Sequence, residues 1–106
     1  MSPDHWSPEE KKIAHRAFDA ALQREIAAVL AELKERAASA AGADDIWSIE
    51  QFLVTRRREI DAKYDFRYSQ LTMVFGRLMR DGWLSEQDLV GISETKLSSI
   101  RFLATM

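Results

Sequence analysis

The sequence predicts an all-α protein with two long helices followed by two short C-terminal helices. Apolar residues recur at spacings of three and four over much of the 106-residue chain, and no segment alternates with the period of two that is typical of strands. Neither glycine nor proline interrupts the chain between Pro8 and Gly42. We therefore expect one helical domain over residues 1–106, with residues 1–6 as a short N-terminal tail.

The first long helix is predicted to start after Ser7 and to continue to about Ala40. Ser7 can cap this helix, Pro8 suits its first position, and Glu10 can reach back to complete a capping box. One face carries most of the large apolar residues: Ile13, Phe18, Leu22, Ile26, Val29 and Leu33. Such a helix is roughly 48 Å long, which exceeds the width of a small globular domain. Self-association through the long helices is the simplest way to cover their apolar stripes.

The second long helix is predicted to follow the break at residues 41–43. Asp44 or Asp45 can cap its start, and the pair Asp81-Gly82 can end it, so that helix extends to about Arg80. Residues 61–65 are the place where this helix could kink. Gly76 lies inside it and weakens it by about 1 kcal/mol relative to alanine.

One continuous stripe runs along this second helix. Its members recur at spacings of three and four: Ile46, Ile49, Leu53, Arg57, Ile60, Tyr64, Arg67, Leu71, Val74 and Leu78. Two of these residues are arginines, and a guanidinium on an apolar stripe requires an acid, an aromatic face or a binding partner. The stripe is therefore the predicted working surface of the protein.

Two short helices are predicted at the C-terminal end. Ser85 can begin the first, which ends near Gly91, and Ser93 can cap the second. The second short helix carries three apolar residues at helical spacing: Leu97, Ile100 and Leu103. We expect both to form a lid on the long pair.

Composition excludes several functional classes. The formal net charge of −2 gives no global basic field, and the absence of cysteine excludes disulfides, thiol catalysis and zinc sites built on thiolates. No segment approaches the roughly 20 apolar residues of a membrane-spanning helix. A soluble cytoplasmic protein that binds neither membrane nor nucleic acid is the resulting expectation.

No arrangement typical of an enzyme is found. The two histidines, His5 and His15, are too few for a metal site, and neither has an orienting neighbour in the sequence. There is no glycine-rich phosphate loop and no nucleophile motif. We expect no catalytic, cofactor-binding or metal-binding residues.

The run Arg56-Arg57-Arg58 allows three interpretations. Acidic residues are interleaved with it, and the spacing predicts ion pairs between Arg57 and Asp61 and between Glu59 and Lys63. The run is either a solvated, self-neutralising face, a protein-binding patch centred on Arg57, or a nucleic-acid site. Trp47 lies one position off the stripe, where it either packs on the first helix or contacts a partner.

The sequence resembles the fluorescence recovery proteins of cyanobacteria. The resemblance is carried by Trp6-Ser7, Arg24-Glu25, Asp44-Asp45-Ile46-Trp47, Phe52-Leu53, Arg57, Glu59-Ile60-Asp61, Lys63-Tyr64-Asp65, Arg67, Phe75, Leu78, Gly82 and Lys96. It implies an all-helical homodimer without cofactor or covalent chemistry. It also implies binding to the C-terminal domain of the photoactivated orange carotenoid protein, which speeds return to the orange form and ends photoprotective quenching of the phycobilisome.

The resemblance also suggests a surface for the partner or the dimer. Trp47 and Arg57 match the family, whereas Glu50 and Gln51 replace a histidine and an aspartate, and Met73 replaces a phenylalanine. The full candidate surface comprises Trp47, Glu50, Gln51, Arg57, Asp61, Lys63, Arg67 and Met73. Two hypotheses remain: a regulator of an orange carotenoid protein or a related fold, and a dimeric helical scaffold, from a relative outside cyanobacteria, with a different protein partner.

Overall fold

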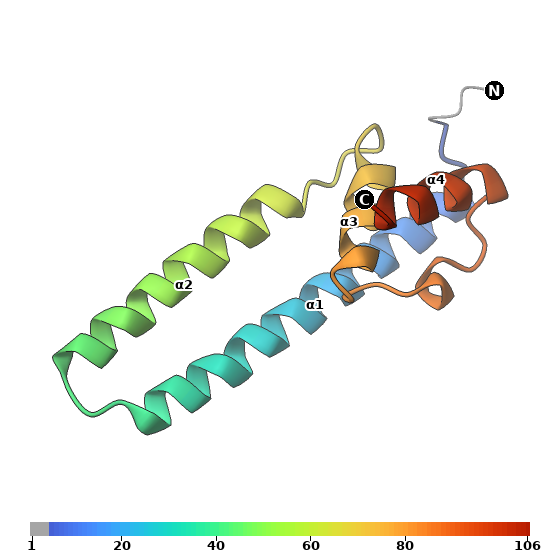
Figure 1. The fold of residues 1–106 in the computed structure, drawn as a ribbon. Coiled ribbons are helices and arrows are strands. Elements are labelled where there is room, and N and C mark those ends of the chain that lie inside the picture. The colour runs from blue at the N-terminus through green and yellow to red at the C-terminus, as the bar shows by residue number, and fades with distance from the viewer. Residues whose placement is uncertain (1–4) are drawn as a thin grey trace.

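The computed structural model describes residues 5–106 as helices joined by short connections, without a strand in that range. The helices are α1 (Pro8–Ser39), α2 (Ala43–Lys63), α3 (Leu71–Arg80), the 3₁₀ helix η1 (Glu86–Leu89) and α4 (Glu94–Ala104). Figure 1 shows α1 and α2 as a long antiparallel hairpin that projects from a head. The head contains α3, η1, α4 and the N-terminal part of α1. The all-α prediction is confirmed.

The start of α1 has the capping box that the sequence predicts. The Ser7 hydroxyl accepts a hydrogen bond from the Glu10 amide at 3.1 Å, and the Glu10 carboxylate accepts one from the Ser7 amide at 3.0 Å. Pro8 occupies the first turn, where its missing amide proton has no helical partner to lose. The helix ends with Ala40 as its C-cap, as predicted.

The start of α2 differs in its capping residue from the prediction. Gly42 is the N-cap and offers no side chain, so neither Asp44 nor Asp45 is the cap. Both aspartates lie in the first turn, where the helix dipole stabilises their negative charges. The Asp45 carboxylate instead accepts a hydrogen bond from the Ala41 amide at 2.8 Å.

The end of α2 corrects the prediction of a helix that extends to Arg80. Helix α2 stops at Lys63, within residues 61–65 where a kink was expected to be possible, and residues 64–70 form an irregular connection before α3. Aromatic packing explains this break: the Phe18 ring lies 5.3 Å from that of Tyr64 and 5.0 Å from that of Phe66, centroid to centroid. A continuous helix could not direct both rings at the same residue of α1. The predicted ten-residue stripe is therefore divided between α2, the connection and α3.

The core lies in the head. Its buried apolar side chains are Trp6, Ala14, Ala17, Phe18, Ala21, Leu71, Val74, Phe75, Leu78, Leu84, Leu89, Ile92 and Ile100. Trp6 is buried and donates a hydrogen bond from its indole nitrogen to the Tyr68 carbonyl at 3.1 Å, so it belongs to this core. Ser93 caps α4 as predicted, because its hydroxyl accepts a hydrogen bond from the Lys96 amide at 3.4 Å. Ser85 precedes η1 as predicted, but its amide and hydroxyl both donate to the Asp88 carboxylate. The short C-terminal helices pack on α3 and on the head portion of α1, and they do not cover the long pair.

Candidate functional site

Helix α2 presents one face to α1 and another to solvent. The face toward α1 carries half-buried or buried side chains at helical spacing: Ile49, Phe52, Arg56, Ile60 and Lys63. Because each residue turns the helix by about 100°, other positions face away from α1. The exposed positions on the side away from α1 form what we call the outer face of α2: Trp47, Glu50, Gln51, Val54, Arg57, Arg58 and Asp61.

Trp47 is the most unusual residue of the outer face. It is 61% exposed, so the interpretation that it packs against the first helix is wrong for the isolated chain. A large exposed aromatic side chain on a face that also carries an arginine is typical of surfaces that bind other proteins. The outer face therefore has the composition of an interaction surface.

The predicted pair of Arg57 and Asp61 forms on the same face. The Arg57 Nε atom lies 3.7 Å from the Asp61 carboxylate, and the two side chains are 85% and 70% exposed. Such an exposed pair contributes little to folding, typically 0.2–1 kcal/mol. The guanidinium therefore remains available to a partner.

Lys63 does not belong to this exposed surface. Its side chain is only 5% exposed, and its ammonium lies 2.7 Å from the buried carboxylate of Glu25. The predicted pair of Lys63 with Glu59 is thus wrong, because Glu59 instead pairs with Arg56 at 2.6 Å. The correct partner of Lys63 is 38 residues away in the chain.

The last two candidate residues lie apart from α2. Arg67 is in the connection after α2, where its Nε atom donates to Asp65 at 2.9 Å and its side chain is 68% exposed. This contact lowers the pKa of the Asp65 carboxyl and raises the pKa of the Arg67 guanidinium. Met73 is on α3 in the head and is 59% exposed. The eight candidates therefore occupy the hairpin, the connection and the head rather than one patch.

The structure also identifies surface residues outside the candidate set. Ile26 and Leu30 are 44% and 47% exposed on α1, and Ile46, Leu53 and Val54 are similarly open on α2. The spacing of four between Ile26 and Leu30 places both on one side of the helix. The hairpin thus exposes apolar side chains from both of its helices.

A second set of polar contacts holds η1 against α1 and involves a residue pair that the sequence did not predict. Arg24 binds both carboxylate oxygens of Asp88, at 2.8 and 3.0 Å, and also donates to the Trp83 carbonyl at 3.0 Å. The Arg24 hydrogen bond lowers the pKa of Asp88 to about 2, despite partial burial. These contacts stabilise the head and leave the outer face of α2 untouched.

The described part of the chain has neither a cluster of metal-binding side chains nor a helix suited to span a membrane. Residues 5–106 contain no group of three or more histidine, cysteine or acidic side chains arranged to hold a metal ion. Among the helices of the same range, none is both long enough and apolar enough to cross a membrane.

The fold and the outer face of α2 define a small all-helical protein with a projecting hairpin, a compact head and an exposed aromatic and charged surface. The family model of the photoprotection regulator fluorescence recovery protein matches residues 6–104. The fluorescence recovery protein of Synechocystis sp. (strain ATCC 27184 / PCC 6803 / Kazusa) is 37% identical over 101 residues, which cover 95% of this chain and 93% of that protein. The chain belongs to the fluorescence recovery protein family.

Solved structures of the family have the same fold. The fluorescence recovery protein of Fremyella diplosiphon matches with a TM-score of 0.91 and 39% identity, over 96% of this chain and 100% of that one. The protein from Synechocystis sp. PCC 6803 matches with a TM-score of 0.91 and 36% identity over the same shares. The head and the hairpin are therefore arranged as in these relatives.

Proposed function

We propose that this protein is a non-enzymatic regulator that binds the C-terminal domain of a photoactivated orange carotenoid protein. Binding accelerates the return of that protein to its resting orange form and so ends photoprotective quenching. The partner is the one that the family resemblance implies, and membership in a family of photoprotection regulators supports this assignment. No covalent step is required of the regulator, because it acts by binding one conformation of its partner better than the other.

The observation that carries this proposal is the exposure of Trp47 and Arg57 on the outer face of α2. Both residues match the family, and neither is engaged in the core of the chain. A partner can bury both side chains in an interface. Tryptophan and arginine are among the residues that most often dominate protein–protein affinity. Arg56, in contrast, points into the hairpin, so the arginine run is divided between two faces, which argues against nucleic acid as the partner.

We further propose that the protein acts as a homodimer formed through the long helices. Five apolar side chains of the hairpin are exposed in a single chain, and a second copy would cover them: Ile26, Leu30, Ile46, Leu53 and Val54. A self-complementary pairing of this kind closes with twofold symmetry. The dimer then presents two copies of Trp47 and Arg57.

A second candidate function is a dimeric scaffold with a different protein partner. Three exposed positions favour it, because Glu50, Gln51 and Met73 replace residues of the cyanobacterial pattern. Gln51 lacks a negative charge that could orient an arginine, and Met73 retains the apolar contact but not the aromatic ring. The two functions share the fold and the dimer and differ only in the partner.

The first test is the dark recovery rate of a photoactivated orange carotenoid protein, followed by absorbance with and without this protein. We expect marked acceleration by the wild type. We expect Arg57→Ala to weaken the apparent affinity about tenfold, which corresponds to roughly 1.4 kcal/mol. Arg16→Ala is the matched control, because Arg16 is an exposed arginine on α1, outside the outer face of α2.

The outcomes separate the two functions. No acceleration by a folded dimeric wild type would reject the orange carotenoid protein as partner and favour the scaffold. If the wild type and Arg57→Ala accelerate recovery with the same dependence on protein concentration, Arg57 does not contact the orange carotenoid protein.

A further inference from the structure

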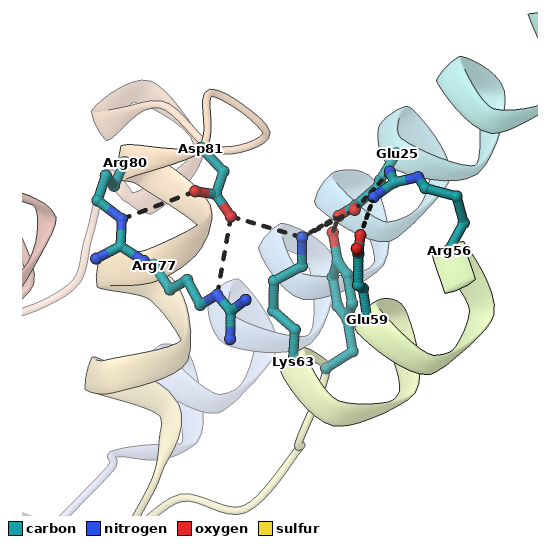
Figure 2. A network of polar contacts seen from close by, with 8 residues as sticks. Glu25, Arg56, Glu59, Lys63, Arg77, Arg80 and Asp81 are labelled. Carbon is teal, nitrogen blue, oxygen red and sulfur yellow. Dashed lines mark hydrogen bonds and ion pairs between the residues drawn. The ribbon is translucent and has the colours of Figure 1, made fainter. Parts of the chain in front are cut away.

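The carboxylate of Glu25 lies at the base of the hairpin and is completely buried. Three donors converge on it: Lys63 at 2.7 and 2.8 Å, Arg56 at 3.0 Å and Tyr64 at 2.9 Å. Figure 2 shows Lys63 and Arg56 directed at Glu25. Arg56 and Lys63 lie on the last two turns of α2, and Tyr64 is its C-cap. One side chain of α1 therefore binds the whole C-terminal end of α2.

The same network reaches the head. The Lys63 ammonium lies 3.6 Å from the carboxylate of Asp81, the C-cap of α3 (Figure 2). Asp81 in turn lies 3.9 Å from Arg77 and 3.7 Å from Arg80. Three helices thus meet at one buried ammonium.

The electrostatics of Glu25 match this role as an acceptor. Burial alone would raise the pKa of Glu25, but the hydrogen bonds from Lys63 and Tyr64 outweigh burial and hold that pKa below its usual value. Burial and the contact with Glu25 raise the pKa of the Tyr64 hydroxyl, so it keeps its proton and donates. The carboxylate is therefore ionised, with each oxygen satisfied.

Few other contacts fix α2. Of its 21 residues only Ile60 and Lys63 are buried, and one of these is the lysine of the network. The helix does not continue into α3, so the direction of α2 is not set by an unbroken backbone. Farther out, the Arg36 guanidinium lies 4.4 Å from the centre of the Phe52 ring, in a contact that solvent can reach.

We propose that Glu25 is a positioning residue that fixes the base of α2 against α1 and the head. It thereby sets the placement of the outer face of α2, which carries Trp47 and Arg57, relative to Met73 on the head. The consequence for partner binding rests on the proposed function, whereas the mechanical role does not. Without the carboxylate, Lys63 and Arg56 lose their shared acceptor, and the base of α2 moves to bring these cations to water.

The absence of cysteine in the sequence makes the mechanical role directly measurable. Cysteines introduced by Ala62→Cys at the base of α2 and Ser98→Cys on α4 both replace exposed residues outside the network. Pulsed electron paramagnetic resonance on spin labels attached to these cysteines measures the distance between α2 and the head. Dilution with excess unlabelled protein restricts the signal to pairs within one chain.

We expect a single narrow distance in the labelled protein and loss of that narrow distribution in Glu25→Gln. Glu10→Gln is the matched control, because Glu10 is also a buried carboxylate on α1 with a lysine partner, Lys96, but contacts only the head. We expect that control to be destabilised while it keeps the narrow distance. An unchanged distribution in Glu25→Gln would overturn the proposal.

A double variant keeps the proposal testable if Glu25→Gln does not fold. Glu25→Gln combined with Lys63→Met removes the acid and its main cation together, so no buried ammonium is left without a partner. We expect this variant to fold and still to show the broadened distribution. A narrow, wild-type distance would mean that apolar packing alone positions α2, and the proposal would fail.

The recovery assay adds the functional arm. In a preparation whose wild type accelerates recovery, we expect Glu25→Gln to lose several-fold of that acceleration at unchanged dimer mass, whereas Glu10→Gln retains it. If Glu25→Gln accelerates recovery as much as the wild type, Glu25 is not required to position the outer face of α2 for the partner. If the wild type itself does not accelerate recovery, the proposed function fails while the distance measurement still decides the mechanical role.

Discussion

Two carboxylates of α1 are buried, and each is stabilised by its own set of donors. Glu25 binds the end of α2, whereas Glu10 accepts hydrogen bonds from the backbone amides of Ser7 and Ser93 and from Lys96. Lys96 also donates to the His5 carbonyl at 2.6 Å. A buried carboxylate is tolerated only when it is paired and hydrogen-bonded. Both residues therefore tie together segments that are distant in sequence.

Glu10→Gln should lose stability in a pH-dependent way. Burial alone would raise the pKa of Glu10, but its backbone hydrogen bonds and Lys96 lower that pKa from 4.5 to about 2. A lowered folded-state pKa stabilises the protein above the unfolded pKa, and this contribution disappears as the pH falls toward the folded value. We expect Glu10→Gln to be less stable than wild type by on the order of 3 kcal/mol at neutral pH, with the difference shrinking between about pH 5 and pH 2.

Urea unfolding at fixed protein concentration and a series of pH values measures this difference. Glu9→Gln is the control, because the neighbouring Glu9 side chain is 82% exposed and should show little effect at any pH. A stability loss for Glu10→Gln that stays constant down to pH 2 would contradict the assignment.

At the residue level, the sequence predicted local pairs and missed distant ones. The pair of Arg57 and Asp61 and the capping box of Ser7 with Glu10 depend on residues three or four apart, and both form. The partner of Lys63 was predicted as Glu59 at the same local spacing, but tertiary packing places Glu25 closer. Local spacing cannot report a competing acid on another helix.

At the level of elements, α2 ends at Lys63, within residues 61–65 where the sequence allowed a kink, but the predicted continuation of the helix to Arg80 is wrong. Spacings of three and four persist through Tyr64, Arg67 and Leu71, and neither glycine nor proline marks a stop there. The helix ends because the rings of Tyr64 and Phe66 pack on Phe18. Tertiary contacts of this kind override helix propensity and leave no local signal.

Gly76 is an element-level position where propensity and packing give opposite expectations. A β-carbon at this site would lie 2.6 Å from the Leu103 β-carbon and 3.3 Å from the Ile100 carbonyl oxygen. The missing side chain thus allows α3 and α4 to approach closely. Helix propensity alone would favour alanine by about 1 kcal/mol.

We expect Gly76→Ala to destabilise the protein by about 1–2 kcal/mol, because the cost of overpacking exceeds the gain in propensity. Thermal or urea unfolding measures the change. Gly42→Ala is the control, because a β-carbon there meets no atom within 4 Å, so only a small effect is expected. If Gly76→Ala is more stable than the wild type, α4 can move to accommodate the added methyl group without a loss of stability, which contradicts the prediction.

On the scale of the whole molecule, the chain is longer and more exposed than a compact monomer of its size. Its dimensions are 59 × 24 × 20 Å and its radius of gyration is 16.7 Å, against about 13 Å for a compact domain of this length. Its accessible surface is 6957 Å², whereas a compact 12.2 kDa monomer exposes about 6,100 Å². The excess is similar in size to the roughly 800 Å² that each partner buries in a standard protein interface.

The proposed dimer accounts for this excess surface, and Leu53→Glu tests it. Leu53 is 36% exposed on α2 and belongs to the exposed apolar group of the hairpin. A carboxylate there would be buried without a designed partner if a second chain covers the hairpin, so we expect the dimer to weaken at least about tenfold. Light scattering or sedimentation over a concentration series measures the mass relative to the 12.2 kDa chain.

Thr55→Glu is the matched control for this prediction. Thr55 is exposed and lies two residues farther along α2, which turns it roughly 200° from Leu53, so the same charge enters the same helix on another side. We expect this variant to keep the wild-type mass. If Leu53→Glu also keeps it, Leu53 lies outside the interface; if the wild type is monomeric at every concentration, the exposed hairpin serves another partner and the dimer proposal is wrong.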